Sequence, residues 1–273
     1  MSLKNQNLDV QGHRGCRGLY PENTLPSFQH AIEIGVNTLE LDVVITKDRK
    51  VVVSHDPFFS HIICVDEKNN YILQKEEKIK HKIFDMQYEQ VKKYKCGTLK
   101  HPCFPNQIQT PAYKPLLSEV IELAESLSKS ICYNIETKCT LFTDNVFHPK
   151  PKEFANLLIE IINHYQINSK VIIQSFDIRT LQHLKNEEGI RTSLLVDNTF
   201  TPEKNISHLG FKPDIYSPNY LLVTKELKDF CDNHNINILP WTVNKEEDMI
   251  KLINLGVDGI ITDYPDRLLN IIQ

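Results

Sequence analysis

The chain has 273 residues, 41% of them hydrophobic, and a formal net charge of -4 from 31 basic and 35 acidic side chains. This length and apolar content fit one large globular domain of the barrel type, spanning residues 1–273, better than two small ones. The slightly acidic balance argues against nucleic acid as a partner, so an anionic substrate has to be bound by local charges. The sequence contains no run of about 18 apolar residues, which argues against stable insertion in a membrane.

The amino terminus and the cysteines bear on the compartment. The opening Met-Ser-Leu-Lys-Asn-Gln lacks the apolar core of a signal peptide. We therefore expect a cytoplasmic protein as the chain stands, and a periplasmic or secreted one if a leader has been removed. The seven cysteines are spread over positions 16 to 231 without a Cys-x-x-Cys spacing. This usage predicts reduced thiols that act as small apolar residues, and no structural disulfide.

The beginning of the chain alternates between strand and helix. A first strand over residues 8–14 ends in Gly-His-Arg-Gly, and Thr24 is a plausible N-cap for a helix that has Pro26 in its first turn and ends at Gly35. The next strand carries Glu40 and Asp42. Successive side chains of a strand point to opposite faces, so these two carboxylates share a face. Leaving them unpaired would cost roughly several kcal/mol each, which predicts a divalent cation or a fixed cationic partner.

The turn after this strand is predicted to bring a histidine to the carboxylates. If the chain folds back tightly around Asp48 and Arg49, residue 44 lies opposite residue 53, and Asp42 lies opposite His55. Residues 57–115 then break the rhythm, because they are polar, rich in lysine and punctuated by prolines. We expect an insertion, folded in part, above one face of the barrel. Its lysines predict a solvated face, or steering of an anionic substrate or contact with lipid headgroups.

Regular alternation resumes after the insertion. Further strands are expected at 131–138, 171–176, 192–197, 214–218, 236–243 and 259–263, and helices at 116–127, 154–165, 178–188, 225–234, 246–255 and after Pro265. Eight strands with crossovers predict an α/β fold, a (β/α)8 TIM barrel with a small inserted segment after the second strand's hairpin. A doubly wound open sheet is the alternative, but no Gly-x-Gly-x-x-Gly follows any strand.

The position of active sites in such barrels selects candidate residues. Sites lie at the carboxyl ends of the strands, and the polar and aromatic residues that meet this condition are His13, Arg14, Glu40, Asp42, Glu136, Lys138, Gln174, Asn219, Trp241 and Asp263. Three carboxylates offer hard oxygen ligands, which favour one divalent cation, Mg²⁺ or Ca²⁺ and also Mn²⁺, over zinc. His13 and His55 remain free to carry protons near neutral pH. Arg14 and Lys138 suit a phosphate.

Each candidate also has a purely structural interpretation. Glu40 and Asp42 could form an ion pair with Arg14 and Lys138 without a metal. The single tryptophan, Trp241, is as compatible with core packing as with the wall of a pocket. Asp263 fits a loop-fixing or capping residue better than a ligand, and polar residues such as Gln174 and Asn219 often satisfy a loop backbone.

The ordered motifs resemble a known family. Gly-His-Arg-Gly, Pro-Glu-Asn-Thr, Glu-x-Asp with Thr-x-Asp and then His-Asp, Glu-x-Lys, Ser-Phe, Trp-Thr-Val-Asn and Thr-Asp-x-Pro run in that order from residue 12 to 265. Together they resemble the glycerophosphodiester phosphodiesterase family. The resemblance implies a barrel, a divalent cation, and hydrolysis of a small-molecule glycerophosphodiester to glycerol 3-phosphate and an alcohol.

The resemblance also implies roles for individual residues. Glu40, Asp42 and Glu136 match the metal ligands of the family, His13 and His55 its general acid and base, and Arg14 and Lys138 its phosphate contacts. The nucleophile is either a metal-activated water or the 2-hydroxyl of the substrate. Two other functions stay open: a lysophospholipase D-like lipid phosphodiesterase, hinted at by the Phe58-Phe59 and Ile62-Ile63 pairs, and a catalytically silent barrel that binds phosphodiesters. The sequence carries no signal for the oligomeric state.

Overall fold

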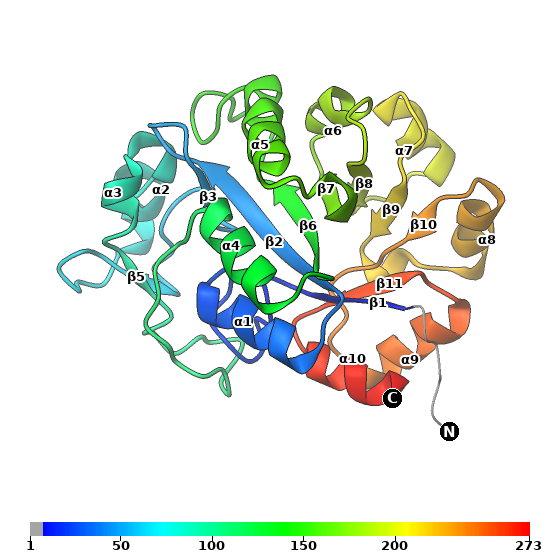
Figure 1. Cartoon of the computed structure of the whole chain (residues 1–273), viewed down its shortest axis with the longest axis horizontal. Helices are drawn as coiled ribbons and strands as arrows, with labels where there is room; N and C mark the ends of the chain where they lie inside the picture. Colours follow the sequence, from blue (N-terminus) through cyan, green and yellow to red (C-terminus); the bar gives the residue numbers. More distant parts are fainter. Residues whose placement is uncertain (1–7) are drawn as a thin grey trace.

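The structure is a computed structural model that describes residues 8–273. The expectation about the opening Met-Ser-Leu-Lys-Asn-Gln lies outside the described residues. Within residues 8–273, no helix is both long and apolar enough to cross a membrane. Figure 1 shows strands at the centre of the molecule, helices arranged around them, and a separate group of small elements beside β3.

The central sheet is a nearly closed parallel barrel. Its strands are β1 (Asp9–Gly12), β2 (Thr38–Ile45), β6 (Cys132–Thr137), β7 (Val171–Ser175), β8 (Arg191–Val196), β9 (Ile215–Pro218), β10 (Asn237–Ile238) and β11 (Gly259–Thr262). They pair in the order β10-β9-β8-β7-β6-β2-β1-β11. Backbone hydrogen bonds such as Ile261 N to Pro240 O, at 3.0 Å, link the two ends of this series. The predicted TIM-barrel fold is confirmed.

Helices pack on the outside of the barrel. They are α1 (Leu25–Ile34), α4 (Leu117–Leu127), α5 (Pro151–Tyr165), α6 (Ile178–Leu184), α7 (Pro202–Leu209), α8 (Lys225–Asn233), α9 (Glu246–Leu255) and α10 (Pro265–Ile272). Thr24 caps α1 and accepts a hydrogen bond from the Ser27 N–H group, as expected. The sequence prediction missed α7, although Thr201 caps it and Gly210 ends it in a left-handed conformation. Both signals are visible in the sequence.

Two expected elements are shorter in the structure. The strand expected over residues 236–243 contains only β10, since Pro240 has no N–H group for the ladder. The helix expected over residues 178–188 ends at Leu184. The shorter strand places Trp241 after the end of β10, and Trp241 still lines the cavity at this end of the barrel.

The hairpin between β2 and β3 (Val51–Val53) corrects the predicted register by one residue. Val44 lies opposite Val52, not residue 53, and the Ser54 N–H group donates to the Asp42 carbonyl at 2.9 Å. The Thr46 N–H group donates to the Lys50 carbonyl, so three residues form the loop, and Arg49 has a φ of 62°. A three-residue loop with a left-handed last residue is a common hairpin, and its odd length shifts the pairing by one. His55 therefore lies beyond the ladder and not opposite Asp42.

The segment from residue 57 to residue 115 forms several small elements. They are β4 (Cys64–Val65), η1 (Gln74–Glu76), α2 (Glu77–Lys80), η2 (Ile83–Asp85), α3 (Tyr88–Val91) and β5 (Lys95–Cys96). A cluster of buried side chains, among them Phe59, Ile83 and Val91, packs against Val44 and Val52 on the outward face of the hairpin. The insertion therefore rests on the β2–β3 hairpin. Its status as a segment within a single catalytic domain stays a prediction.

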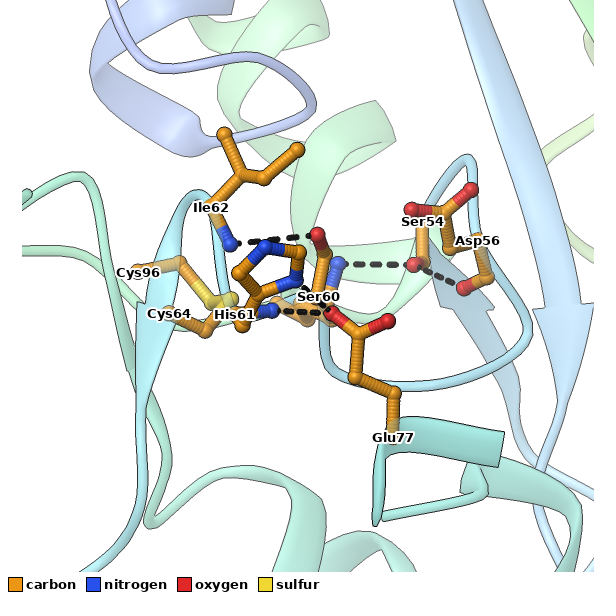
Figure 2. The surroundings of a disulfide bond; sticks show 9 residues. Ser54, Asp56, Ser60, His61, Ile62, Cys64, Glu77 and Cys96 are labelled. Carbon is orange, nitrogen blue, oxygen red and sulfur yellow. Dashed lines mark hydrogen bonds and ion pairs between the residues drawn. A yellow bond between two sulfur atoms is a disulfide. The ribbon is translucent and has the colours of Figure 1, made fainter. Parts of the chain in front are cut away.

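A disulfide in this insertion corrects the expectation of reduced thiols. Cys64 and Cys96 lie directly opposite each other on β4 and β5, with their Cα atoms 4.1 Å apart, and their sulfur atoms are bonded. Figure 2 shows the bond close to the contact between His61 and Glu77. The two cysteines are 32 positions apart in sequence, so only the antiparallel pairing of two very short strands reveals that they meet. The other five cysteines are free.

Candidate active site

A cavity of about 160 Å³ opens at the carboxyl ends of the barrel strands. It is lined by His13, Arg14, Arg17, Glu40, His55, Glu136, Lys138, Gln174, Phe176, Leu195, Trp241, Thr242 and Ile261. The fold thus brings together both expected histidines, both expected phosphate contacts and two of the three expected carboxylates in one lining. Asp42 is buried immediately behind this lining.

Three carboxylates meet on two adjacent strands. Asp42 of β2 lies opposite Glu136 of β6, and Glu40 lies two residues before Asp42 on the same face. One ligand oxygen from each residue lies within 4.8 Å of the other two, and all three side chains are buried. Burial, together with the charges of Asp42 and Glu136, raises the pKa of Glu40 well above its usual range. A cation among these oxygens would relieve that repulsion.

The hydrogen-bond pattern of the carboxylates fits a hard divalent cation. Glu40 accepts hydrogen bonds from the Arg14 N–H group at 2.9 Å and from Gln174 Nε2 at 2.8 Å, which fix its orientation. Asp42 Oδ1 is buried and accepts no hydrogen bond from the described residues 8–273. Carboxylate oxygens held by neighbouring donors, with one oxygen left available, are suitable ligands for Mg²⁺, Ca²⁺ or Mn²⁺.

Arg14 and Lys138 balance part of the negative charge. Arg14 Nε lies 3.2 Å from Asp42 Oδ2, and Lys138 Nζ lies 2.6 Å from Glu136 Oε1 and 3.4 Å from Asp42 Oδ1. Burial alone would raise the pKa of Asp42, but the charges of Lys138 and Arg14 hold this pKa well below its usual range. The ion pairs considered from the sequence are therefore present for Asp42, whereas within residues 8–273 Glu40 forms none with Arg14 or Lys138. These pairs do not remove the repulsion between Glu40 and the carboxylates of Asp42 and Glu136, so they are compatible with a cation site.

His13 is held by a carboxylate on the neighbouring strand. Its Nδ1 lies 2.6 Å from Asp263 Oδ1, and its Nε2 lies 3.9 Å from Glu40 Oε2. Burial lowers the pKa of His13 below its usual value, and Asp263 opposes that shift. Burial alone would raise the pKa of Asp263, but the charge of His13 and the hydrogen bond between the two side chains lower this pKa below its usual value. Asp263 therefore contacts a proposed catalytic group, a role that the sequence analysis did not consider, since it weighed loop fixing or capping only against a ligand role.

His55 reaches the cavity from the end of the hairpin. Its Nδ1 lies 2.9 Å from Asp56 Oδ1, and about a third of its side chain (34%) is exposed. The residues on either side of His55 are linked to each other and to Lys114: Lys114 Nζ donates to Ser54 Oγ at 2.7 Å, and Ser54 Oγ donates to the Asp56 carbonyl at 2.6 Å. Figure 2 shows the hydrogen bond between Ser54 and Asp56. Lys114 comes from the insertion and was not predicted from the sequence.

Glu22 is a further site residue that the sequence analysis did not select. It accepts from Arg14 Nη1 at 2.9 Å and lies 2.7 Å from Arg17 Nε. The next residue, Asn23, donates to Asp42 Oδ2 at 2.9 Å. Both belong to the Pro-Glu-Asn-Thr motif, which the sequence analysis used for the resemblance without giving these side chains a role. Both side chains lie in the connection between β1 and α1, and their contacts fix the side chains of Arg14, Arg17 and Asp42.

The remaining candidates divide into two groups. Gln174 is buried and bonded to Glu40, and Trp241 lines the cavity, with Nε1 donating to the Ser217 carbonyl at 2.8 Å. The ring of Phe176 meets that of Trp241 edge to face at 5.5 Å. Asn219 does not line the cavity, because its side chain caps a short helical turn, η4 (Tyr220–Leu222).

A parallel barrel whose strand ends present paired histidines, clustered carboxylates and two cationic side chains defines a class of site suited to phosphate esters. Comparisons with known proteins agree. The model of the glycerophosphoryl diester phosphodiesterase family matches residues 13–267. A glycerophosphodiester phosphodiesterase from Caldanaerobacter subterraneus subsp. tengcongensis is 33% identical over 267 residues, covering 97% of each chain. The chain therefore belongs to the glycerophosphoryl diester phosphodiesterase family, whose members are phosphoric diester hydrolases.

Solved structures share the fold. The structure of a glycerophosphoryl diester phosphodiesterase candidate from Silicibacter pomeroyi DSS-3 superposes with a TM-score of 0.86 at 26% identity, covering 97% of this chain and 92% of that one. A phosphodiesterase from Oleispira antarctica, solved with the product sn-glycerol-3-phosphate, gives a TM-score of 0.78 at 21% identity, with coverage of 100% and 99%. At that identity the second likeness concerns the fold alone.

Proposed function

We propose that the protein hydrolyses glycerophosphodiesters to glycerol 3-phosphate and an alcohol, with Glu40, Asp42 and Glu136 holding one divalent cation, Mg²⁺ or Ca²⁺ and also Mn²⁺. The observation that carries this proposal is the convergence of His13 and His55 on the cavity that Glu40 and Glu136 line. When bound, the cation supplies positive charge that stabilises the phosphoryl oxygens in the transition state. The small size of the cavity, about 160 Å³, suits a phosphodiester with its glycerol carbons.

The side chains then divide the remaining tasks. Arg14 and Lys138 bind phosphate oxygens, the arginine through its forked donors and the lysine as a point charge. One histidine removes the proton of the nucleophile, and the other protonates the leaving alcohol as its bond to phosphorus breaks. Trp241 packs against the glycerol carbons. Both nucleophiles considered from the sequence are compatible with this arrangement, namely water and the substrate's 2-hydroxyl.

The decisive assay measures glycerol 3-phosphate release from glycerophosphocholine, with and without a chelator. We expect activity that disappears with the chelator and returns on addition of Mg²⁺, Ca²⁺ or Mn²⁺. His13→Ala and His55→Ala should each lower kcat by at least about 100-fold, in the range typical of a lost general acid or base. His183→Ala, a change on the outer helix α6, is a matched control and should leave kcat unchanged.

Two outcomes would contradict the proposal, and another would choose between the two nucleophiles. Full activity in His13→Ala or His55→Ala would remove that histidine from the mechanism. Undiminished turnover of a 2-deoxyglycerol analogue would exclude the 2-hydroxyl as nucleophile. An inactive wild-type protein with every added metal would leave the interpretation as a catalytically silent, phosphodiester-binding barrel.

We also propose that the protein functions in an oxidising compartment, which corresponds to the periplasmic or secreted alternative of the sequence analysis and not to the cytoplasm. The Cys64–Cys96 disulfide supports this proposal, since stable disulfides form and persist mainly outside the reducing cytosol. Alkylation of protein taken directly from cells, carried out under denaturing conditions so that buried thiols also react, should then label five cysteines and spare two. Labelling of all seven would contradict the proposal.

A further inference from the structure

Lys114 is a buried cation that the proposed mechanism does not use. It lies at the end of the insertion and is only 5% exposed. Among the described residues 8–273 it forms no ion pair, and its ammonium group donates one hydrogen bond to a side chain, that of Ser54. A buried ammonium is normally paired with a carboxylate, because an unpaired charge loses its hydration without compensation. Lys114 therefore needs an explanation that its own contacts must supply.

The backbone next to Lys114 is fixed against β3. The Val53 N–H group donates to the Pro115 carbonyl at 2.8 Å, and helix α4 begins two residues later, at Leu117. On the side of the insertion, the Nζ atom of Lys114 lies 5.6 Å from the centre of the buried Phe59 ring. The ammonium group is thus held between the hairpin and the insertion, at the end of β3 where the catalytic His55 follows.

The hydrogen bond from Lys114 determines how the Ser54 hydroxyl is used. An ammonium group can only donate, so Ser54 Oγ accepts from Lys114 at 2.7 Å and gives its own proton to the Asp56 carbonyl at 2.6 Å. The Ser54 N–H group donates to the Asp42 carbonyl at 2.9 Å. Both residues that flank His55 are therefore held in place, and Lys114 fixes the link between them.

Asp56 connects this link to the imidazole ring of His55. A carboxylate only accepts, so the contact of 2.9 Å between His55 Nδ1 and Asp56 Oδ1 places the proton on Nδ1 and the lone pair of the neutral ring on Nε2. Burial alone would raise the pKa of Asp56, but the hydrogen bond with His55 and the charges of His55 and Lys114 lower this pKa below its usual value. Lys114 thus favours the ionised carboxyl group that orients the ring.

We infer that Lys114 is a positioning residue for His55, which fixes the segment 54–56 so that Nε2 of His55 stays in place for proton transfer. The inference rests on the proposed function, because His55 transfers a proton only if the site is catalytic. His55 lines the cavity, whereas Lys114 is buried outside its lining. Lys114 therefore acts through Ser54 and Asp56 and not on the substrate, and through it the insertion completes the active site.

Lys114→Met tests the inference, because methionine keeps most of the length of the side chain but has no donor. The assay measures glycerol 3-phosphate release from glycerophosphocholine with added Mg²⁺, at a temperature well below the thermal unfolding of each variant. We expect kcat to fall about tenfold or more and KM to change less than about twofold, because a displaced catalytic group slows the reaction without removing a substrate contact. Lys80→Met on α2, which removes an exposed lysine paired with Glu76, is the matched control and should change neither constant.

Two further backgrounds show whether Lys114 acts through its proposed partners. Ser54→Ala removes the acceptor, so kcat should fall at least as far as in Lys114→Met, and the double variant should be no slower than Ser54→Ala alone. In His55→Ala, followed over long incubations, addition of Lys114→Met should cause no further loss of kcat. A residue that only stabilises the fold would not show this dependence on Ser54 and His55.

The outcomes separate this inference from the proposed function. An unchanged kcat in Lys114→Met, or a raised KM with an unchanged kcat, would overturn the inference and leave the proposed function standing. A loss of kcat that is as large in the Ser54→Ala or His55→Ala background as in the wild-type protein would also overturn it, since Lys114 would then act independently of these residues. Absence of turnover by the wild-type protein with every added metal would remove the proposed function and the inference together.

Discussion

His13 and Asp263 directly follow two neighbouring strands, at the seam where the first strand of the barrel meets the last. Gly12 of β1 is opposite Thr262 of β11, so the residues that follow them are neighbours, and their side chains meet at 2.6 Å. Asp263 also accepts a hydrogen bond from Asn244 Nδ2 at 2.8 Å, which fixes its second oxygen. A carboxylate can only accept, so Nδ1 of His13 carries the proton and Nε2 faces the cavity with its lone pair.

Asp263→Asn should therefore lower kcat much more than it changes KM. An amide at this position can donate to Nδ1, which favours the opposite tautomer of His13, and it removes the charge that stabilises the imidazolium form. We expect a loss of roughly 100-fold or more in kcat, as for other histidines deprived of an orienting carboxylate. The nitrogen chemical shifts of the His13 ring, measured by NMR, should show the change of tautomer directly. Unchanged shifts together with unchanged kcat would show that Asp263 only fixes its loop.

Periodicity predicted the barrel, because buried parallel strands and amphipathic helices leave strong local patterns. It did not predict the hairpin register, since one extra loop residue at Lys47–Arg49 shifts every pair by one. It also missed the Cys64–Cys96 bond and the hydrogen bond from Lys114 to Ser54, because these contacts depend on how an insertion with short elements folds over the hairpin.

The candidate site was predictable to a different degree for different residues. The barrel rule selected His13, Glu40 and Glu136, and parallel pairing brings them together at the cavity, although Glu40 lies inside β2, whose last residues pair with β3. Asp263 was found by the same rule, but its partner was not, because the pairing of the first and last strands is a tertiary contact across 250 positions. Sequence position alone does not distinguish a carboxylate that fixes a loop from one that orients a histidine.

A divalent cation should stabilise the folded protein as well as activate it. The cation binds the folded carboxylate cluster and not the unfolded chain, so a concentration of 100 times the dissociation constant adds about 2.7 kcal/mol to the free energy of unfolding. Glu136→Gln should lose most of this gain, because one of three charged ligands is removed. Thermal unfolding with and without Ca²⁺ or Mg²⁺ measures the effect. Glu153→Gln on the surface of α5 is the control, and an equal gain in both variants would contradict a site at Glu136.

Glu22 should make the stability of the protein depend on acid pH. Burial alone would raise the pKa of Glu22, but the charges of Arg14 and Arg17 hold this pKa far below its usual range. A carboxyl group with a depressed pKa stabilises the folded state above its unfolded pKa of about 4.3, and this contribution is lost as the pH falls toward the folded pKa. Glu22→Gln should thus lower the free energy of unfolding by about 3 kcal/mol near pH 7, because it breaks a buried pair.

Urea unfolding at several pH values tests this prediction. The difference between the wild-type protein and Glu22→Gln should shrink as the pH is lowered below about 4. Glu33→Gln, on the exposed face of α1, provides a carboxylate of the same type without a buried partner and should show a small difference at every pH. A difference for Glu22→Gln that stays constant down to acid pH would assign the loss to packing and not to charge.

Reduction of the Cys64–Cys96 disulfide should destabilise the insertion. The two strands that it joins contain two residues each, too few to hold the segment between them by backbone hydrogen bonds alone. For cysteines 32 positions apart, the chain-entropy model gives a stabilisation of about 3 to 4 kcal/mol. Cys64→Ser should therefore lower the unfolding temperature and increase hydrogen exchange in β4 and β5. Cys103→Ser, which removes an exposed free thiol of the same insertion, should change neither, and equal effects of the two variants would contradict a structural role for the bond.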